Sequence, residues 1–135
     1  MVIYRLLADL VVLLHAAYVS FVVFGFVLIV LGAVLRRQWV QNFWFRLSHL
    51  AAILIVCAEA VTGIVCPLTS LENQLRAKAG QSGYPGDFIG HWAHELIFFD
   101  VPPWALTVIY ILFGLLVCAA FLVAPPRIPW RSTKK

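Results

Sequence analysis

The chain has 135 residues, of which 63% are hydrophobic and only 12% are charged. Soluble domains are about 45–50% apolar, and a chain of this length cannot build a core that hides so much apolar surface. A soluble globular protein is therefore excluded. The formal net charge of +4 comes from Lys and Arg near the ends of the apolar segments and in the tail, which is typical of cytoplasmic anchoring and not of a nucleic-acid-binding surface.

Three apolar segments predict three membrane-spanning helices, at residues 6–35, 43–66 and 104–124. A span needs about 20 residues, so the first is long enough to tilt or to project beyond the bilayer. It is too long for the apolar region of a signal peptide, and we expect an uncleaved anchor. The second ends at Cys66-Pro67 because proline lacks the backbone donor that continues a helix.

The segment between the second and third spans, residues 67–103, is predicted to contain short interfacial helices. Thr69 and Glu72 have the spacing of a capping box, with Thr69 as N-cap and Glu72 at the third helical position. Asp87 is expected to cap an amphipathic helix at residues 88–99, which is too short to cross a bilayer.

The distribution of Lys and Arg predicts the orientation, because these residues are enriched in cytoplasmic loops. They occur in the first loop and its edge and in the C-terminal tail, at Arg36, Arg37, Arg46, Arg127, Arg131, Lys134 and Lys135. The sequence therefore predicts an all-α multi-pass protein in one domain. Its N-terminus and residues 67–103 face outward, and its C-terminus is inside.

Four ionisable residues lie within the first two spans: Asp9, His15, His49 and Glu59. A charged group at bilayer depth costs about 2.5–3.5 kcal/mol, so each one suggests a functional site. With the spans antiparallel and a rise of about 1.5 Å per residue, His15 and Glu59 fall at the same depth, and we expect them to be in contact. Asp9 falls about 9 Å nearer the outside.

We expect a polar pocket in the outer leaflet, formed by Asp9, His15, Glu59 and His91 and covered by the helix at residues 88–99. The alternatives are structural. His15 and Glu59 then only satisfy each other, Asp9 pairs with Arg5, and the polar face of the outer helix simply meets water. Arg46 and His49 are predicted to form a separate inner site, with helix packing as the alternative.

Imidazole and carboxylate groups also allow a metal or haem site. The candidate ligands are His15, Glu59, His91, His94 and Glu95, and a bis-histidine haem would use His15 with His91 or His94. No C-x-x-C-H, H-E-x-x-H or G-x-S-x-G motif is present. Neither a cofactor nor a catalytic residue is assigned.

Several motifs resemble a family of small bacterial inner-membrane proteins that is known only as a domain of unknown function. They are Tyr4-Arg5-Leu6-Leu7-Ala8-Asp9 with His15, the Cys66-Pro67-Leu68-Thr69 junction with Glu72, and Gly83-Tyr84 followed by Phe88-Ile89-x-His91. The resemblance covers nearly the whole chain. It implies an integral protein of the bacterial inner membrane and brings no established activity.

Three functions remain open at this point. The first is a non-enzymatic membrane component, surrounded by lipid and associated with other subunits or with itself. The second is a redox protein that binds haem or a metal through His15, Glu59 and His91. The third is a proton or small-solute pathway in an oligomer, because three spans without an inverted repeat are unlike most transporters.

Overall fold

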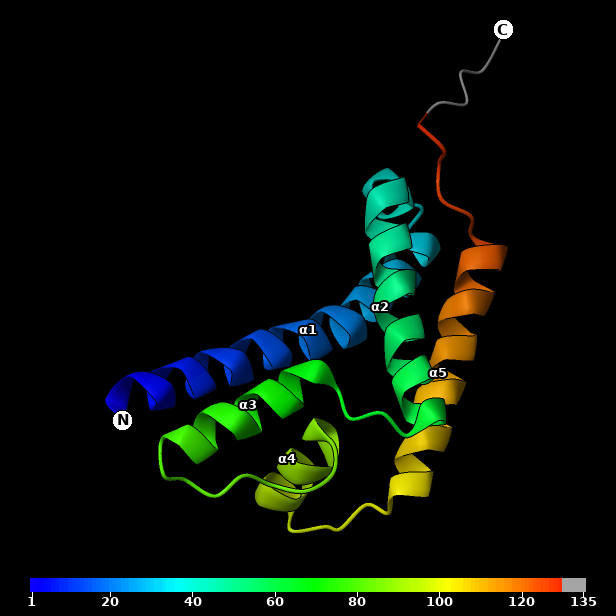
Figure 1. Cartoon of the computed structure of the whole chain (residues 1–135). Coiled ribbons are helices and arrows are strands. Elements are labelled where there is room, and N and C mark those ends of the chain that lie inside the picture. The colour runs from blue at the N-terminus through cyan, green and yellow to red at the C-terminus, as the bar shows by residue number, and fades with distance from the viewer. Residues whose placement is uncertain (130–135) are drawn as a thin grey trace, which may run out of the picture.

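The computed structural model describes residues 1–129 as an assembly of helices without a β-sheet among them (Figure 1). In chain order the elements are α1 (Val2–Val34), the 3-10 helix η1 (Gln38–Gln41), α2 (Phe43–Thr62), α3 (Pro67–Lys78), α4 (Phe88–Ile97) and α5 (Pro103–Val123). Helices α1, α2 and α5 are long and apolar enough to cross a membrane. The protein is therefore an all-α multi-pass membrane protein, as the composition predicted.

Helices α2 and α5 lie side by side and run in opposite directions (Figure 1). Helix α1 passes the loop end of α2 and then diverges, so that its N-terminal half forms an arm at a wide angle to the α2–α5 pair. Helix α3 folds back along this arm, and α4 lies between α3 and the first turn of α5. The molecule consequently has the shape of an L.

The core lies where the three long helices meet, and its buried members are Val22, Ala52, Ile53 and Val117. Because lipid is as apolar as these side chains, close van der Waals packing between the helices stabilises this core. The Tyr18 hydroxyl donates a 2.6 Å hydrogen bond to the Ala52 carbonyl, which joins α1 to α2. From Tyr18 towards the N-terminus of α1, no further hydrogen bond joins these two helices among residues 1–129.

Two glycines of α1 allow close approach at the inner end of this core. A Cβ atom on Gly25 would lie 2.6 Å from Cδ2 of His49, and one on Gly32 would overlap the side chain of Val40 in η1. These glycines therefore pack against specific partners, a histidine ring and the turn between the first two spans.

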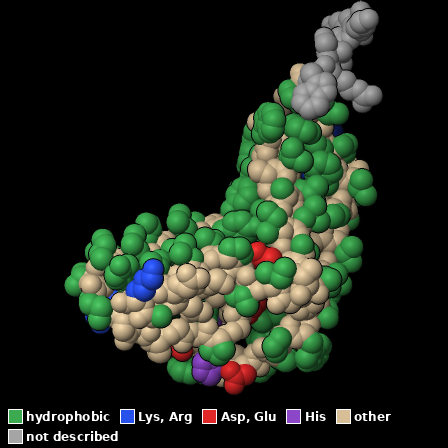
Figure 2. Space-filling view, in the orientation of Figure 1, with side chains coloured by type: hydrophobic (Ala, Val, Ile, Leu, Met, Phe, Trp, Pro, Cys, Tyr) green, Lys and Arg blue, Asp and Glu red, His purple; other side chains and the backbone are tan. Residues whose placement is uncertain are grey.

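The outer half of α1 has two different faces. Ala8, Val11 and His15 are buried on the side towards α3 and α4. Exposed apolar side chains occupy much of the remaining surface, at Ile3, Leu6, Leu7, Leu10, Leu13 and Leu14. Figure 2 shows hydrophobic side chains along the edge of the arm away from α3 and α4, with acidic and histidine groups at the opposite edge. The apolar surface is compatible with contact to a lipid bilayer.

The 33 residues of α1 correspond to about 50 Å of helix, whereas the hydrocarbon core is about 30 Å thick. The excess length explains how the arm can carry α3, which is a polar helix. Helix α2 ends at Thr62 because Gly63 adopts a left-handed conformation, with φ +71°.

The capping-box prediction for α3 is wrong. The helix begins at Pro67, with Cys66 as N-cap, because proline is preorganised for the first helical position. Thr69 consequently lies inside the first turn and is fully buried, and Glu72 binds other partners. The predicted Asp87 cap of α4 is confirmed, because Oδ1 of Asp87 accepts a 2.9 Å hydrogen bond from the Gly90 N–H. The helix is shorter than predicted and ends at Ile97, because Phe98 adopts a left-handed conformation.

The first loop and the segment after α5 lie at the same end of the molecule. The Arg127 N–H donates to the Gln41 carbonyl at 2.8 Å, which joins two segments that both carry arginine. The tail residues used for the orientation, Arg131, Lys134 and Lys135, lie outside the described residues.

Candidate functional site

A cavity of about 740 Å³ opens between α1, α2, α4 and α5. Most of its lining is apolar, from residues such as Val19, Val23, Ile109 and Phe113. Three members of the predicted pocket, His15, Glu59 and His91, also line it, and so does His94. These polar residues come from the middle of α1, the last turn of α2 and α4, whereas apolar side chains make up most of the rest of the lining.

His15 is buried in this cavity wall, with only 6% of its surface exposed. Its ring stacks on Phe88 of α4, with centroids 4.0 Å apart and an interplanar angle of 19°. Its Nδ1 is buried without a hydrogen-bond partner in the described part of the chain. Phe88, which lies on the helix expected to cover the pocket, therefore covers the His15 ring. The His15 imidazole keeps one nitrogen that can still form a hydrogen bond.

The predicted contact between His15 and Glu59 is not formed, since no hydrogen bond or ion pair joins them among residues 1–129. We expected this contact because two neighbouring spans would place the residues at the same depth. Helix α1, however, diverges from α2 beyond Tyr18. Glu59 is half-buried and lies close to Cys66 at the start of α3. Burial raises the pKa of the Cys66 thiol. A hydrogen bond from the Leu68 backbone N–H lowers this pKa, and the nearby Glu59 charge raises it.

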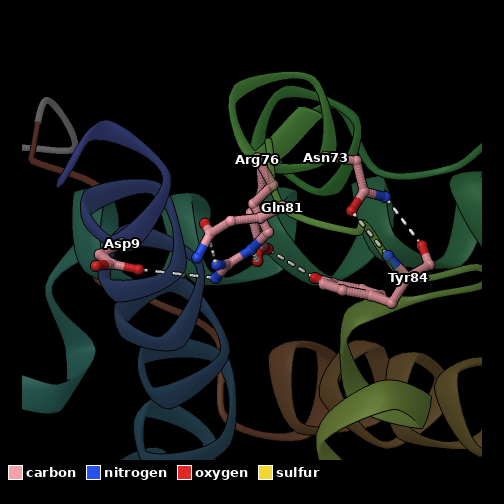
Figure 3. A network of polar contacts seen from close by, with 6 residues as sticks. Asp9, Asn73, Arg76, Gln81 and Tyr84 are labelled. Carbon is pink, nitrogen blue, oxygen red and sulfur yellow. Dashed lines mark hydrogen bonds and ion pairs between the residues drawn. The ribbon is translucent and has the colours of Figure 1, made fainter. Parts of the chain in front are cut away.

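Asp9 is separate from the cavity. Its side chain is 64% exposed, and its Oδ1 lies 3.8 Å from Nη2 of Arg76 on α3 (Figure 3). It therefore pairs with α3 and not with Arg5, the partner considered from the sequence. At that exposure the ion pair contributes little to stability.

Glu72 is the buried carboxylate that the sequence analysis did not assign to the site. It is only 1% exposed, and its Oε1 and Oε2 each accept a 2.7 Å hydrogen bond, from Nε of Arg76 and from the Tyr84 hydroxyl. Asn73 fixes the same loop by two hydrogen bonds with the Tyr84 backbone, at 2.9 and 3.1 Å (Figure 3).

The spacing of polar residues along α3 indicated this network. Thr69, Glu72 and Arg76 recur at intervals of three and four, so they share one face of α3. Because we interpreted Glu72 as part of a capping box at the start of its own helix, we did not recognise this shared face. Burial raises the pKa of Tyr84 above its ordinary value, and the hydrogen bond to Glu72 adds to the rise. The phenol therefore remains a donor at neutral pH.

A second, polar cleft of about 550 Å³ lies beside this network. Its lining includes Glu72, Arg76, Tyr84, His91, Trp92 and Glu95. The His91 ring stacks on Tyr84, with centroids 3.8 Å apart and an angle of 5°. His91 lines both the cleft and the apolar cavity, so the two spaces share this residue.

The candidate metal ligands do not come together. Nowhere in residues 1–129 do three or more His, Cys, Asp or Glu side chains form a group that could hold a metal ion. His15 and His91 are occupied by stacking on Phe88 and Tyr84, and Nδ1 of His94 contacts Asp100 at 2.8 Å. Glu95 is exposed at the cleft.

The predicted inner residues, Arg46 and His49, bind main-chain carbonyls of neighbouring helices. Nη2 of Arg46 donates to the Ala120 carbonyl at 2.8 Å, near the C-terminus of α5, where a cation is favourable. Nε2 of His49 lies 2.7 Å from the Val22 carbonyl and must donate to it, because a carbonyl only accepts. Both side chains are almost fully buried, and they hold α2 against α5 and α1.

A family model described as Protein of Unknown function (DUF2784) matches residues 5–126. The chain belongs to this family. No curated protein and no solved structure matches it.

The matched region of this DUF2784 member includes every residue that lines the cavity and the cleft. The family description names no activity, so the chemistry must be argued from the geometry. The arrangement offers an apolar space at membrane depth, a polar end with histidine and carboxylate groups, and a polar cleft beside it. This combination suits binding of an amphiphilic molecule.

Proposed function

We propose that the protein is a non-enzymatic component of the bacterial inner membrane that holds a lipid-soluble molecule in the cavity between α1, α2, α4 and α5. The observation that carries this proposal is the cavity itself, with its volume of about 740 Å³ and its mostly apolar lining. Ligand sites are typically about 300–1,000 Å³, apolar, and supplied with a few polar groups that orient the ligand.

The polar groups lie at one end, which supports a ligand with an apolar body and a polar head. His15, Glu59 and His91 are at the outer end, whereas Val23 and Phe113 are deeper along their helices. His15 has a buried nitrogen without a partner among the described residues. A hydrogen bond from the ligand head to this end would offset part of the cost of keeping polar groups in an apolar setting.

A pair of substitutions on α2 tests the cavity. Ala60 lines it, whereas Ala58 is exposed on the same helix and lies outside its lining. Native mass spectrometry of protein purified in a mild detergent should show a retained lipid-soluble molecule in the parent protein and in Ala58→Phe. Ala60→Phe fills the space and should lose it. Retention by Ala60→Phe, or a parent protein without any bound molecule, contradicts the proposal.

We also propose that the N-terminus and the α3–α4 segment face the outside. Arg36 and Arg37 lie in the first loop, and the Arg127 N–H binds that loop at Gln41, so these positive charges share one end of the molecule. Positive charge favours the cytoplasmic side. A membrane-impermeant thiol reagent on intact cells should label Ser82→Cys but not Arg36→Cys, with Cys57, Cys66 and Cys118 replaced by alanine. The reverse pattern would show the opposite orientation.

A further inference from the structure

We propose that the polar cleft receives the head of the molecule whose tail fills the cavity, and that this head combines a phosphate with a primary amine. The ligand is then a phospholipid with an amine headgroup. This inference rests on the proposed function, because it needs the tail to occupy the cavity. It goes further by naming the chemical class of the head and the residues that recognise it.

The two spaces share one lining residue, His91. His91 lines the apolar cavity of about 740 Å³ and also the polar cleft of about 550 Å³. One space is bordered by the spans, whereas the other is bordered by α3, α4 and the loop that joins them. An amphiphile placed across His91 would therefore have its tail among the spans and its head in the cleft. The cavity has histidine and carboxylate groups at its polar end, whereas Arg76 lines only the cleft.

Arg76 supplies the means to bind a phosphate. Its Nε is used by Glu72 at 2.7 Å, but Nη1 lies 3.4 Å from Gln81 and Nη2 lies 3.8 Å from Asp9. These two distances exceed the 2.7–3.2 Å range of good N–H···O bonds. The outer edge of the guanidinium is thus weakly engaged, and guanidinium edges bind phosphate oxygens in pairs. The Arg76 side chain is 20% exposed, so this edge is partly accessible.

The charge balance argues against a head with a net negative charge. Arg76 is surrounded by the carboxylates of Glu72 and Asp9, and Glu95 lines the same cleft. These carboxylates outnumber the guanidinium, so an anionic headgroup would meet net repulsion. A head in which an ammonium group offsets the phosphate avoids this repulsion.

Glu95 selects among such zwitterionic heads. Its carboxylate is exposed at the cleft and accepts hydrogen bonds only. A primary ammonium has three N–H donors for it, whereas a quaternary ammonium has none. Glu95 makes no hydrogen bond or ion pair among residues 1–129, so a substitution there leaves the α3 network intact.

The test compares three phospholipids that share the same acyl chains and carry phosphoethanolamine, phosphocholine or phosphoglycerol heads. Delipidated protein is titrated with each lipid, and binding is followed by native mass spectrometry. The ethanolamine lipid should bind about tenfold more tightly than the other two, as one charge-assisted hydrogen bond supports. Glu95→Gln should abolish the preference over the choline lipid. Lys78→Gln is the control, because it also removes an exposed charge of the segment between α2 and α5, and Lys78 lines neither the cleft nor the cavity.

The outcomes separate this inference from the proposed function. Equal binding of all three lipids, with loss in Ala60→Phe, overturns the headgroup assignment and leaves the cavity proposal standing. Tightest binding of the glycerol lipid also overturns it, because Arg76 would then dominate the cleft. Binding that Ala60→Phe does not change overturns both.

Discussion

The Tyr84 hydroxyl donates a 2.7 Å hydrogen bond to Oε2 of Glu72, twelve residues earlier in the chain. Glu72 is almost fully buried on α3, which lies along α1, and its other oxygen is bound by Arg76. A buried carboxylate is costly unless it is paired and hydrogen-bonded. The contact therefore ties the loop before α4 to α3 and shapes the inner wall of the polar cleft.

Substitution of Glu72 should show how much this contact contributes. Glu72→Gln keeps the shape but removes the charge, and we expect a loss of about 1.5–3 kcal/mol, the usual contribution of hydrogen bonds to charged groups. Thermal unfolding in detergent measures the change. Asp9→Asn is the control, with an expected change of about 0–1 kcal/mol because its ion pair is exposed. Equal effects of the two variants would show that Glu72 does not organise the segment.

The ionisation of Tyr84 should make the stability of the protein depend on pH in the alkaline range. Its pKa is raised in the folded protein, whereas in the unfolded chain it ionises near its ordinary value of about 10. The folded state therefore holds more protons above about pH 10, and this contribution is present below that pH and lost as the pH rises above it.

Tyr84→Phe removes the ionising group and should flatten the decline in stability above about pH 10. At neutral pH the variant should be less stable by about 1.5–3 kcal/mol, because a hydrogen bond to a charged carboxylate is lost. Denaturant unfolding between about pH 8 and pH 11 measures both effects. A decline of unchanged steepness in Tyr84→Phe would assign it to another group.

Gly32 and Val40 should show coupled effects. Gly32→Ala places a methyl group in the space of the Val40 side chain, and overpacking of this kind costs about 1–3 kcal/mol. Val40→Ala removes both Cγ atoms and so vacates part of that space, and the double variant should be more stable than the sum of the single effects predicts. A double-mutant cycle measures the coupling. Additive effects would mean that the two residues are not in contact.

Arg46 should matter more than any arginine of the first loop. Arg46→Gln removes the charged donor to the Ala120 carbonyl and the cation over the Phe121 ring. We expect a loss of about 1.5–3 kcal/mol in thermal unfolding. Arg36→Gln serves as the control, because Arg36 is exposed, and its effect should stay within about 0.5 kcal/mol. A silent Arg46→Gln would contradict its role in holding α2 to α5.

Much of the candidate site was visible in the sequence. His15, Glu59 and His91 were selected because ionisable groups in or beside an apolar span are costly, and all three line the same cavity. Asp9 was placed with them by its depth alone. Depth along a helix does not specify the direction of a side chain around it, and Asp9 pairs with α3 instead.

The three apolar spans and the Asp87 cap could be predicted because they depend on local properties, the length of an apolar run and the preference of an N-cap. The burial of Glu72 and the joining of cavity and cleft at His91 could not. Both depend on the divergence of α1 from α2 and on the return of α3 along α1, which no local pattern encodes. These arrangements follow from packing between distant segments, where steric fit between Gly32 and Val40, or between Gly25 and His49, decides how the helices cross.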